Sequence, residues 1–530
     1  MAFAYWFGLV SALIILLICY VRRNDSILTS IPSSVLAFGP KRTTDQDVLA
    51  TAERLANSPS LESREVLPPR TGRRYIVVGG GGFLGGWIVT KLLDRGEDMH
   101  NIRLIDIFPP TNHPILLDAI QKGLQFLKVD VTDAEALEAA FTAPWFESAK
   151  NNSADAEPEL TVFHTAANIR FYERKLEFLD RSARVNVGGT ENVIRASRTA
   201  GASVLVYTSS GSVGVWSTRL LLWPWEKEPE HFVQVINDDD SRLPKRHEDF
   251  FSNYAATKMK AEMLVRASDR ANTGPSGSKK VIRTGCIRPG NGVFGPRGDM
   301  LCGAYLKRLT NPSWAKTIFS SFSYVENCAV AHLCYEARLI ELQNGGRNPD
   351  IGGQAFCIAD PGPIPTYGDA YTTLEVLSDG ECTFPVLSAS AMLAVAHIIE
   401  AYVRLQYALA SSGWMLGKLL PVITGPIVNL QPSVFYLTAV HLIFDDSRAR
   451  LPPEKGGLGY TGTWTTIEGL HKTAREHKET ALREGPRGSG SEVDIGLTFF
   501  SRKKANKQKE AVKLNIDVPN VVPVEVTAPS

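Results

Sequence analysis

Three side chains in this sequence have the types and the spacing of a proton-transfer site. Tyr254 and Lys258 are four residues apart within a helical pattern, and Ser210 lies 44 residues before the tyrosine. Positions four apart share one face of a helix, so the phenol and the ammonium can act at one site. The ammonium would lower the pKa of the phenol, so that tyrosinate can take a proton from a carbinol, while Ser210 hydrogen-bonds the substrate oxygen.

A tyrosine and a lysine at this spacing are common on helices, where surface and packing roles are the usual ones. The elements around the pair therefore decide its interpretation. Val204–Tyr207 is an apolar run that predicts the fifth strand of a parallel sheet, and it leads directly to Ser210. A tyrosine and lysine on the helix that follows such a strand favour catalysis over packing.

A glycine-rich turn predicts the start of that sheet. Tyr75–Val78 is a short run of β-branched and aromatic residues that leads into Gly79, Gly82 and Gly85, and Trp87–Arg95 has apolar residues at helical spacing. Glycines let a pyrophosphate approach the backbone, and the free N–H groups at the helix start bind its charge. Glycine-rich turns also serve as plain connections, but here the strand and the helix are both present.

The second predicted strand supplies a carboxylate for an adenosine ribose. Ile102–Ile107 is apolar except for Arg103 and Asp106, and Asp106 lies 21 residues after Gly85. At this position a carboxylate can accept hydrogen bonds from both ribose hydroxyls and would repel a 2′-phosphate, which favours NAD over NADP. The alternative is that Asp106 only begins a turn.

The next two strand ends carry further candidates. Asp130 follows the run Leu124–Val129 and can hydrogen-bond an adenine amino group, although an N-cap at Thr132 or Asp133 explains the same stretch without a ligand. After Leu160–His164, the small residues Ala166 and Ala167 would let a nicotinamide ribose pass close to the chain. His164 itself is expected to be a packed core histidine.

Composition describes a large globular chain and excludes several classes of function. The 530 residues are 44% hydrophobic and 21% charged, with a net charge of +1, which gives no general attraction to nucleic acid. The seven cysteines have neither the spacing of a zinc site nor a C-x-x-C pair, so we expect no metal and no disulfide framework. They are Cys19, Cys286, Cys302, Cys328, Cys334, Cys357 and Cys382.

The N-terminus is expected to be an uncleaved membrane anchor over residues 1–23. Ala2–Val21 has no charged residue and as a helix is long enough to cross a hydrocarbon core of ~30 Å. Arg22 and Arg23 follow, which predicts that the rest of the chain stays cytoplasmic. A cleaved signal peptide is the alternative, but the start lacks a basic region and a clear cleavage site.

Four further regions complete the expected organisation. Residues 24–73 are expected to be a linker interrupted by prolines, with one helix at Thr44–Ala56, and residues 74–300 a dinucleotide-binding domain. Residues 301–475 are expected to be a substrate-binding and membrane-associated region, and residues 476–530 a disordered tail. Within them, Trp216–Trp225 would line an apolar cleft, rest on a bilayer or form a buried loop. Phe384–Phe444 is apolar but interrupted by Glu400, Arg404 and Lys418, which favours helices lying in a membrane interface over a second crossing.

Taken in order, these motifs resemble the extended short-chain dehydrogenase/reductases, and within them the 3β-hydroxysteroid dehydrogenase and sterol-4α-carboxylate 3-dehydrogenase branch. The resemblance covers roughly residues 74–473. Besides the residues above, it depends on these stretches: His164–Ala167, Asn186–Thr190, Tyr207–Ser210, Arg288–Pro296, Tyr324–His332, Phe444–Ala449 and Leu458–Tyr460. One departure is Val78, where many relatives have threonine before the first glycine.

The resemblance implies an α/β fold of the Rossmann type, a doubly wound parallel sheet with a smaller C-terminal substrate-binding region. It implies Ser210 polarising the substrate oxygen, Tyr254 as acid/base, and Lys258 holding the nicotinamide ribose, with Ser209 structural and His332 in packing. The cofactor-binding residues that it implies are Gly79, Gly82, Phe83, Leu84, Gly85, Asp106, Asp130, Val131, Ala166, Ala167, Asn186, Tyr254, Lys258 and Pro289.

The expected activity is NAD-dependent oxidation of a 3β-hydroxyl on a sterol, triterpenoid or related polycyclic terpenoid, with decarboxylation at C4 if the substrate carries a carboxylate there. A 3β-hydroxysteroid dehydrogenase with Δ5-to-Δ4 isomerisation and a ketone reductase are the alternatives. An adaptor without catalysis, which keeps the fold as a scaffold, is the alternative of another class. The resemblance further implies the endoplasmic reticulum membrane, a homodimer, and contacts with other membrane-bound enzymes of one pathway.

Overall fold

The computed structural model describes residues 2–57, 67–145, 157–275, 277–412, 420–484 and 497–498. The predicted disordered tail over 476–530 lies outside these ranges from residue 485 on, except for residues 497–498. Helix α17 (Thr466–Glu484) extends past residue 476, so the first part of the expected tail is helical.

The described residues contain a parallel sheet of seven strands in the order β10-β7-β5-β4-β1-β2-β3. This is the doubly wound order, with β4 at the centre and the strand order reversing between β1 and β4. The predicted Rossmann-type fold is confirmed. The strands are β1 (Arg74–Val78), β2 (Ile102–Asp106), β3 (Gln125–Lys128), β4 (Leu160–His164), β5 (Val204–Thr208), β7 (Arg283–Pro289) and β10 (Ala355–Ile358).

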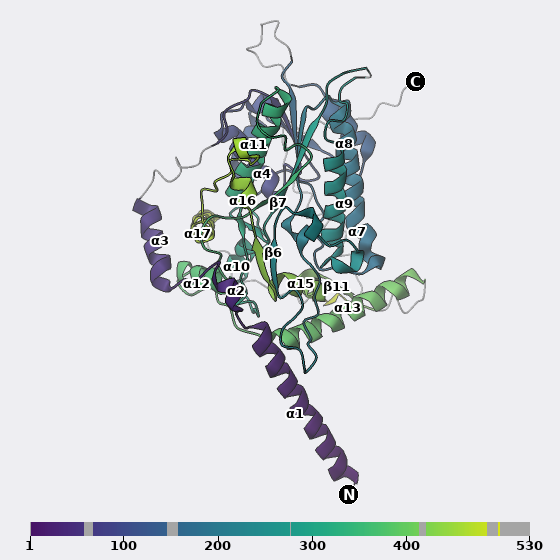
Figure 1. Cartoon of the computed structure of the whole chain (residues 1–530), viewed down its shortest axis with the longest axis vertical. Coiled ribbons are helices and arrows are strands. Elements are labelled where there is room, and N and C mark those ends of the chain that lie inside the picture. Colours follow the sequence, from purple (N-terminus) through teal and green to yellow (C-terminus); the bar gives the residue numbers. More distant parts are fainter. Residues whose placement is uncertain are drawn as a thin grey trace.

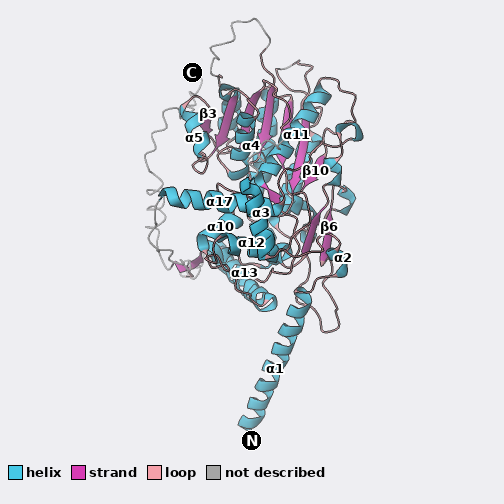
Figure 2. Cartoon of the chain, turned by 90° about the vertical axis from the view of Figure 1, so that its left-hand side faces the viewer, coloured by secondary structure: helices cyan, strands magenta, loops and turns pink. Residues whose placement is uncertain are grey.

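Helices cover both faces of this sheet (Figures 1 and 2). Tyr75 and Val77 of β1 pack into one core cluster and Ile76 and Val78 into another, because successive side chains of a strand point to opposite faces. This two-sided burial explains why the strand is apolar throughout. The first face carries α4 (Phe83–Asp94), α5 (Pro114–Gln121) and α11 (Val325–Gln343); the second carries α6 (Ala134–Thr142), α8 (Thr190–Thr199) and α9 (Asn253–Ala267).

The expected domain boundary at residue 300 does not separate two structural units. β10 and α11 come after it in sequence, yet β10 is the edge strand of the sheet and α11 packs on the sheet beside α4. Conversely, β6 (Val233–Ile236) lies before the boundary and pairs with β12 (His441–Phe444) after it. The substrate-side region is therefore built from segments on both sides of residue 300.

That region lies below the sheet in Figure 1, toward the end from which the N-terminal helix leaves. Its core joins apolar side chains of β6, β12 and several helices. Its elements, with the remaining short ones, are α7 (Leu179–Ala183), β8 (Val293–Phe294), α10 (Cys302–Arg308), β9 (Ser323–Tyr324), α12 (Tyr367–Leu377), α13 (Ala389–Ser411), β11 (Val422–Ile423), α15 (Pro432–Thr438), α16 (Ser447–Arg450) and β13 (Leu497–Thr498).

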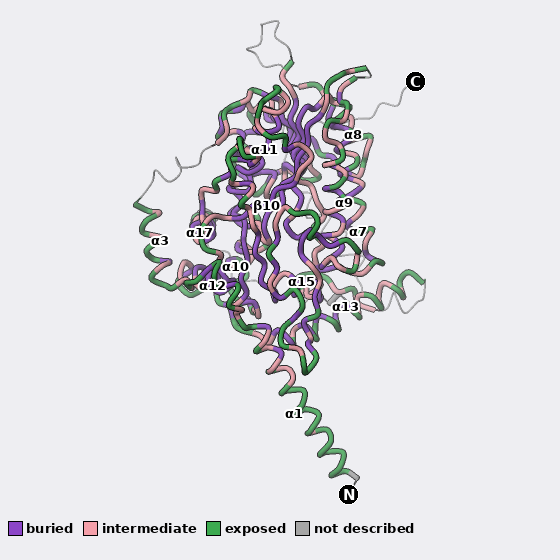
Figure 3. The backbone as a smooth tube through the Cα atoms, viewed as in Figure 1, coloured by how far each residue is buried: buried purple, intermediate pink, exposed green. Residues whose placement is uncertain are grey.

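Helix α1 (Ala2–Leu28) projects from the body, and its outer part is exposed on all sides (Figure 3). Within the described residues, one stretch is long and apolar enough to cross a membrane, Phe3–Leu36, with a mean hydropathy of 2.3 and no burial of its most apolar part. α1 continues without a break past Arg22 and Arg23 and ends at Leu28, which is buried in the body.

The segment expected to be a loose linker is instead packed on the body over residues 24–57. Val35 of α2 (Ser33–Leu36) and Val48 of α3 (Asp45–Asn57) are fully buried. Arg42 pairs with Asp369 at 2.6 Å and Arg54 with Glu468 at 2.7 Å. Proline content indicated a flexible chain here, but long-range apolar and ionic contacts order it.

Candidate active site

The predicted site residues gather at the carboxyl ends of four central strands. Gly79 follows β1, Ala166 follows β4, Ser210 follows β5, and Pro289 ends β7. In a doubly wound sheet this edge, near the reversal of strand order, is where ligands bind. Stretches that are separate in sequence thus converge on one end of the sheet.

At the glycine turn the chain passes close to itself and to the loop after β4, and the approach of a pyrophosphate stays a prediction. Gly79 has φ +85°, a conformation that residues with a side chain rarely adopt. A Cβ at Gly79 would lie 2.6 Å from the amide nitrogen of Ala166, and a Cβ at Gly85 would lie 2.1 Å from the carbonyl oxygen of Gly79. Gly82 is the N-cap of α4, so the helix that starts at Phe83 presents its first amide groups at this turn.

Asp106 faces the glycine turn across the ends of β1 and β2. One carboxylate oxygen accepts a hydrogen bond from the Gly81 N–H at 3.0 Å, and the other accepts from the Ile107 N–H at 2.7 Å. Burial raises the pKa of Asp106, although these backbone hydrogen bonds oppose the shift. Asp106 therefore both stabilises the turn that follows β2 and lies beside the glycine turn. Its binding of a ribose stays a prediction.

The structure gives Asp130 a local role that needs no ligand. It is exposed, and its carboxylate accepts from the Thr132 N–H and hydroxyl at 2.8 Å each, while Asp133 is the N-cap of α6. Val131 beside it is buried. The local capping explanation is thus present in the structure, and contact of Asp130 and Val131 with adenine remains a prediction.

Asn186 connects two of the expected cofactor segments. It lies in a π-helical turn, Arg184–Gly189, a rare feature that is frequent at functional sites. Its amide donates to the Thr257 hydroxyl at 3.0 Å and to the Asn168 carbonyl at 3.2 Å, and its side-chain oxygen accepts from the Asn168 N–H at 2.7 Å. It thereby holds the loop after Ala166 and Ala167 against α9.

The two serines after β5 have different partners. Ser209 is buried, and its hydroxyl donates to Glu262 at 2.6 Å. Ser210 is half-buried, begins a short 3-10 turn, and lies 2.7 Å from the hydroxyl of Ser212. Ser210 also lies near enough to Tyr254 to oppose the rise in the pKa of its phenol. Ser209 is thus engaged in a structural contact, and contact of Ser210 with a substrate oxygen stays a prediction.

Tyr254 and Lys258 are presented by the first turns of α9. Ser252 is the N-cap of this helix, accepting from the Ala255 N–H at 3.3 Å, so the helix begins just before the tyrosine. Tyr254 is half-buried, whereas Lys258 is 1% exposed. The Lys258 ammonium donates to the Thr208 carbonyl at 2.6 Å and lies 4.2 Å from the centre of the Tyr207 ring.

The pKa of Tyr254 differs in direction from the sequence-based expectation. Burial raises the pKa of Tyr254 to about 12, with the Ser210 hydrogen bond opposing the rise. Burial likewise lowers the pKa of Lys258 to about 7. The expected lowering of the phenol pKa by the ammonium is therefore not seen, because the ammonium is directed at Thr208 and Tyr207.

A buried ionic network behind the site was not predicted. Glu262 and Arg288 are fully buried and form a two-bond ion pair, at 2.9 and 2.6 Å. Arg288 also reaches Asp240 at 2.8 Å. Glu262 follows Tyr254 and Lys258 at intervals of four along α9, which is the sequence signal that could have placed it on the same helix face.

Apolar side chains border the tyrosine. Tyr254 packs against a buried cluster that includes Phe251, Leu220, Phe435 and Leu393. Trp314 is stacked on Phe435 with ring centres 4.4 Å apart. The predicted aromatic insertion is therefore part buried and part exposed: Leu220 belongs to this cluster and Leu222 is also buried, whereas Trp223 and Trp225 are exposed.

The two histidines kept out of catalysis are buried in the core. His164 lies 2.9 Å from the Thr190 hydroxyl, and His332 lies between the Thr208 hydroxyl and the Cys328 carbonyl, each at 2.7 Å. Burial lowers the pKa of His164 to about 3 and that of His332 to about 4. All seven cysteines are free, and no cluster of metal-binding side chains occurs within the described residues.

Comparison with known proteins shows one family. The model of the 3-beta hydroxysteroid dehydrogenase/isomerase family matches residues 76–379. A 3beta-hydroxysteroid-dehydrogenase/decarboxylase from Arabidopsis thaliana is 29% identical, covering 80% of this chain and 84% of that protein. A 3 beta-hydroxysteroid dehydrogenase/Delta 5-->4-isomerase from Mycobacterium tuberculosis is 30% identical over 75% of this chain and 88% of its own. A decarboxylating sterol-4-alpha-carboxylate 3-dehydrogenase from Schizosaccharomyces pombe is 27% identical over 55% and 69%, respectively.

Proposed function

Because the chain belongs to the 3-beta hydroxysteroid dehydrogenase/isomerase family, we propose that it oxidises the 3β-hydroxyl of a sterol, triterpenoid or related polycyclic terpenoid with NAD. The chain is a dehydrogenase that acts on CH–OH groups, as the family and its relatives are. The family resemblance expected from the sequence is thereby confirmed. The substrate and the steps after oxidation are the subject of the proposal.

The observation that carries this proposal is the position of the Ser210 hydroxyl near the Tyr254 phenol and an apolar wall. A carbinol oxygen bound between these two hydroxyls would be held against an acid/base group while the hydrocarbon rings contact the apolar cluster. An adaptor has no chemical need for this arrangement, whereas a dehydrogenase for a lipophilic alcohol needs both halves of it.

Each side chain has a role in this scheme. Ser210 donates to the alcohol oxygen and fixes its position. Tyr254 takes the hydroxyl proton, which requires positive charge near the phenol because burial holds its pKa at about 12. Protonated Lys258, on the same helix face, would supply such a charge, and moving its ammonium from Thr208 toward the phenol and a ribose would favour tyrosinate.

The residues present fit a dinucleotide. The Gly79 and Gly85 backbones leave no room for a Cβ, and the start of α4 offers amide groups to a pyrophosphate. When bound, NAD would accept the carbinol hydride. Asp106 beside Gly81 supports NAD over NADP, since a 2′-phosphate would meet its carboxylate.

Decarboxylation at C4 is the finer part of the proposal. Two of the relatives described above are named as decarboxylating enzymes. Oxidation of the 3-hydroxyl of a 4-carboxysterol yields a β-keto acid, which loses CO₂ readily because the new ketone accepts the electrons as an enolate. Isomerisation of a Δ5 double bond is the second candidate, supported by the name of the Mycobacterium tuberculosis relative.

We further propose that α1 anchors the chain as a single span in the endoplasmic reticulum membrane, with the catalytic body in the cytoplasm. Its length, its exposure and the two arginines after its uncharged part support this orientation. A homodimer and contacts with other enzymes of one pathway stay predictions.

The test is NADH formation by detergent-solubilised protein with a matched pair of 3β-hydroxysterols, one with and one without a 4α-carboxylate, followed by mass analysis. Turnover of the carboxylate alone, with loss of CO₂ beyond the oxidation, would establish an oxidative decarboxylase. Turnover of the plain alcohol to a ketone would make the protein a simple dehydrogenase. NAD binding without turnover of any terpenoid alcohol, including larger triterpenoids, would favour the adaptor.

A further inference from the structure

Helix α13 carries an apolar stripe on the side that faces away from the body. The residues of the stripe recur every three or four positions, so they lie on one face. All are exposed, including Ile398 at 68% and Leu405 at 53%. They are Ala391, Ala394, Val395, Ile398, Ala401, Leu405 and Ala408. The opposite face, with Leu393 and Ala396, is buried in the cluster that also contacts Tyr254.

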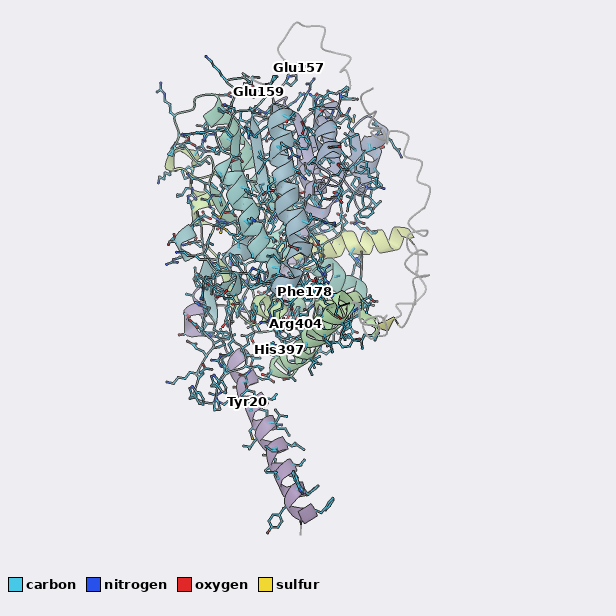
Figure 4. All side chains as sticks on the ribbon, turned by 90° about the vertical axis from the view of Figure 1, so that its right-hand side faces the viewer. Tyr20, Glu157, Glu159, Phe178, His397 and Arg404 are labelled. Atoms are coloured by element: carbon cyan, nitrogen blue, oxygen red, sulfur yellow. The ribbon has the colours of Figure 1, made fainter. Side chains whose placement is uncertain are left out.

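The charged residues that interrupt this region in sequence do not interrupt the stripe. Glu400 is 6% exposed, points into the body and forms two ion-pair contacts with Arg174, both at 2.7 Å. Arg404 pairs with Glu177 at 2.6 Å. Burial and the charge of Arg174 lower the pKa of His397. Figure 4 shows Arg404 near Phe178, on the body side of α13.

The start of α13 is fixed to the base of α1. Asn24 donates to the Ser390 hydroxyl at 2.8 Å, and Asp25 accepts from the Ser390 N–H at 2.8 Å. In Figures 1 and 4, α13 runs crosswise to α1 from this junction. A bilayer crossed by α1 would therefore have its surface along α13.

A pair of tryptophans is fixed to the same junction. Asn24 donates to the Leu220 carbonyl at 3.0 Å and accepts from the Leu222 N–H at 3.1 Å, which holds the loop beside the end of α1. Trp223 and Trp225 extend from that loop, 56% and 74% exposed, with their rings stacked 5.4 Å apart. Tryptophan is enriched at the membrane–water boundary, and Arg22 and Arg23 place that boundary at this level of α1.

We propose that the α13 stripe and the Trp223–Trp225 pair form a second bilayer-contact surface, with α13 lying in the headgroup region of the membrane that α1 crosses. The occupant is a bilayer rather than a second copy of the chain, because the surface continues from the span and pairs an uncharged stripe with interfacial tryptophans. The inference rests on α1 being the proposed span, but not on catalytic activity. If α13 lies in the membrane surface, the apolar cluster that contacts Tyr254 packs directly against a membrane-bound helix. A lipophilic alcohol would then have a short path from the bilayer to Tyr254.

The test uses the full chain with an environment-sensitive fluorophore on single cysteines, in a background with Cys19→Ala because Cys19 is exposed. Labels are placed at Ile398→Cys on the stripe, at Leu13→Cys within α1, and at Ile115→Cys on α5 as the matched control, which is 52% exposed and remote from α1. The protein is reconstituted into phosphatidylcholine vesicles with nitroxide on shallow or on deep acyl carbons. Ala401→Cys serves as a second stripe label if the first variant does not fold.

The expected result is a blue-shifted emission at Ile398 with more loss of intensity from shallow than from deep nitroxide, deep quenching at Leu13, and neither at Ile115. Quenching at Leu13 with water-like emission at Ile398 would overturn the inference and leave the span. Blue-shifted but unquenched emission at Ile398 would overturn it in favour of a second copy. Absence of quenching at Leu13 and Ile398 would overturn the inference together with the span. No outcome depends on finding a substrate.

Discussion

The Lys258 ammonium lies 2.6 Å from the main-chain carbonyl oxygen of Thr208, two residues before Ser210. This hydrogen bond joins the end of β5 to the helix that carries Tyr254, so the serine, tyrosine and lysine of the proposed site are mutually positioned by one buried contact. The same contact holds the ammonium away from the phenol. Several expected outcomes depend on this geometry.

Tyr254→Phe should lower kcat by about 10²–10⁴-fold, because it removes the hydroxyl that takes the proton while leaving the ring in place. NAD affinity, measured by fluorescence titration, should stay near that of the wild type. Tyr402→Phe is the control. Tyr402 lies on α13, away from the site, and its hydroxyl donates to the Pro421 carbonyl at 2.7 Å. Unchanged turnover in Tyr254→Phe would contradict the assignment.

Asp106→Ala should raise the apparent KM for NAD and reduce the preference for NAD over NADP. The variant removes both the ribose acceptor and the charge that repels a 2′-phosphate. Steady-state kinetics with each cofactor measure the effect. Asp118→Ala, which removes an exposed carboxylate paired with Lys122, is the control. Equal discrimination before and after the Asp106 substitution would leave Asp106 with its turn role only.

Arg288→Leu should lower the free energy of unfolding by about 3–5 kcal/mol, because it leaves the buried Glu262 carboxylate without its main counter-charge. Denaturant titration in detergent, followed by circular dichroism, measures the loss. Arg246→Leu is the matched control, since its ion pair with Asp249 is on the surface and its loss should leave stability unchanged. An equal loss of unfolding free energy in both variants would show that the buried ion pair stabilises the fold no more than the surface pair does.

His332→Gln should flatten the dependence of stability on pH between about pH 6.5 and 4. Burial lowers the pKa of His332 to about 4 in the folded chain, while the unfolded chain protonates it near the ordinary value of 6.5. The unfolded state thus binds more protons in this window, so the stability present above pH 6.5 is lost as the pH falls. The contribution of one such histidine is about 3 kcal/mol.

Unfolding free energies at several pH values measure that slope. His231→Gln, at an exposed histidine stacked on Trp216, is the control substitution. A His332→Gln variant with the slope of the wild type would mean that this histidine changes its protonation equally in both states.

Much of the fold was predictable because its signals are local. The apolar run before Gly79, the interval from Gly85 to Asp106 and the spacing of Tyr254 and Lys258 each lie within one or two elements. Parallel strands buried on both faces are apolar throughout, and their ends converge on one edge of a sheet. Local pattern and general topology together therefore placed the expected residues at that edge.

Features that depend on contacts between distant segments could not be predicted in this way. Proline content indicated a free linker, yet Asn24 contacts Ser390, 366 positions away, and Arg42 contacts Asp369. The pKa of Tyr254 was expected to fall, yet it rises, because burial and the direction of a neighbouring ammonium are properties of the folded site.

The sequence by itself determined the type of sheet, the glycine turn and the residues that are predicted to transfer a proton, since each follows from residue types at short spacings. Only the tertiary structure decided that Glu262 meets Arg288 behind the site, that α1 is fixed to α13, and that Glu400 points inward and leaves an uncharged stripe outside. Periodicity shows that a helix has faces, but which face is buried depends on what packs against it.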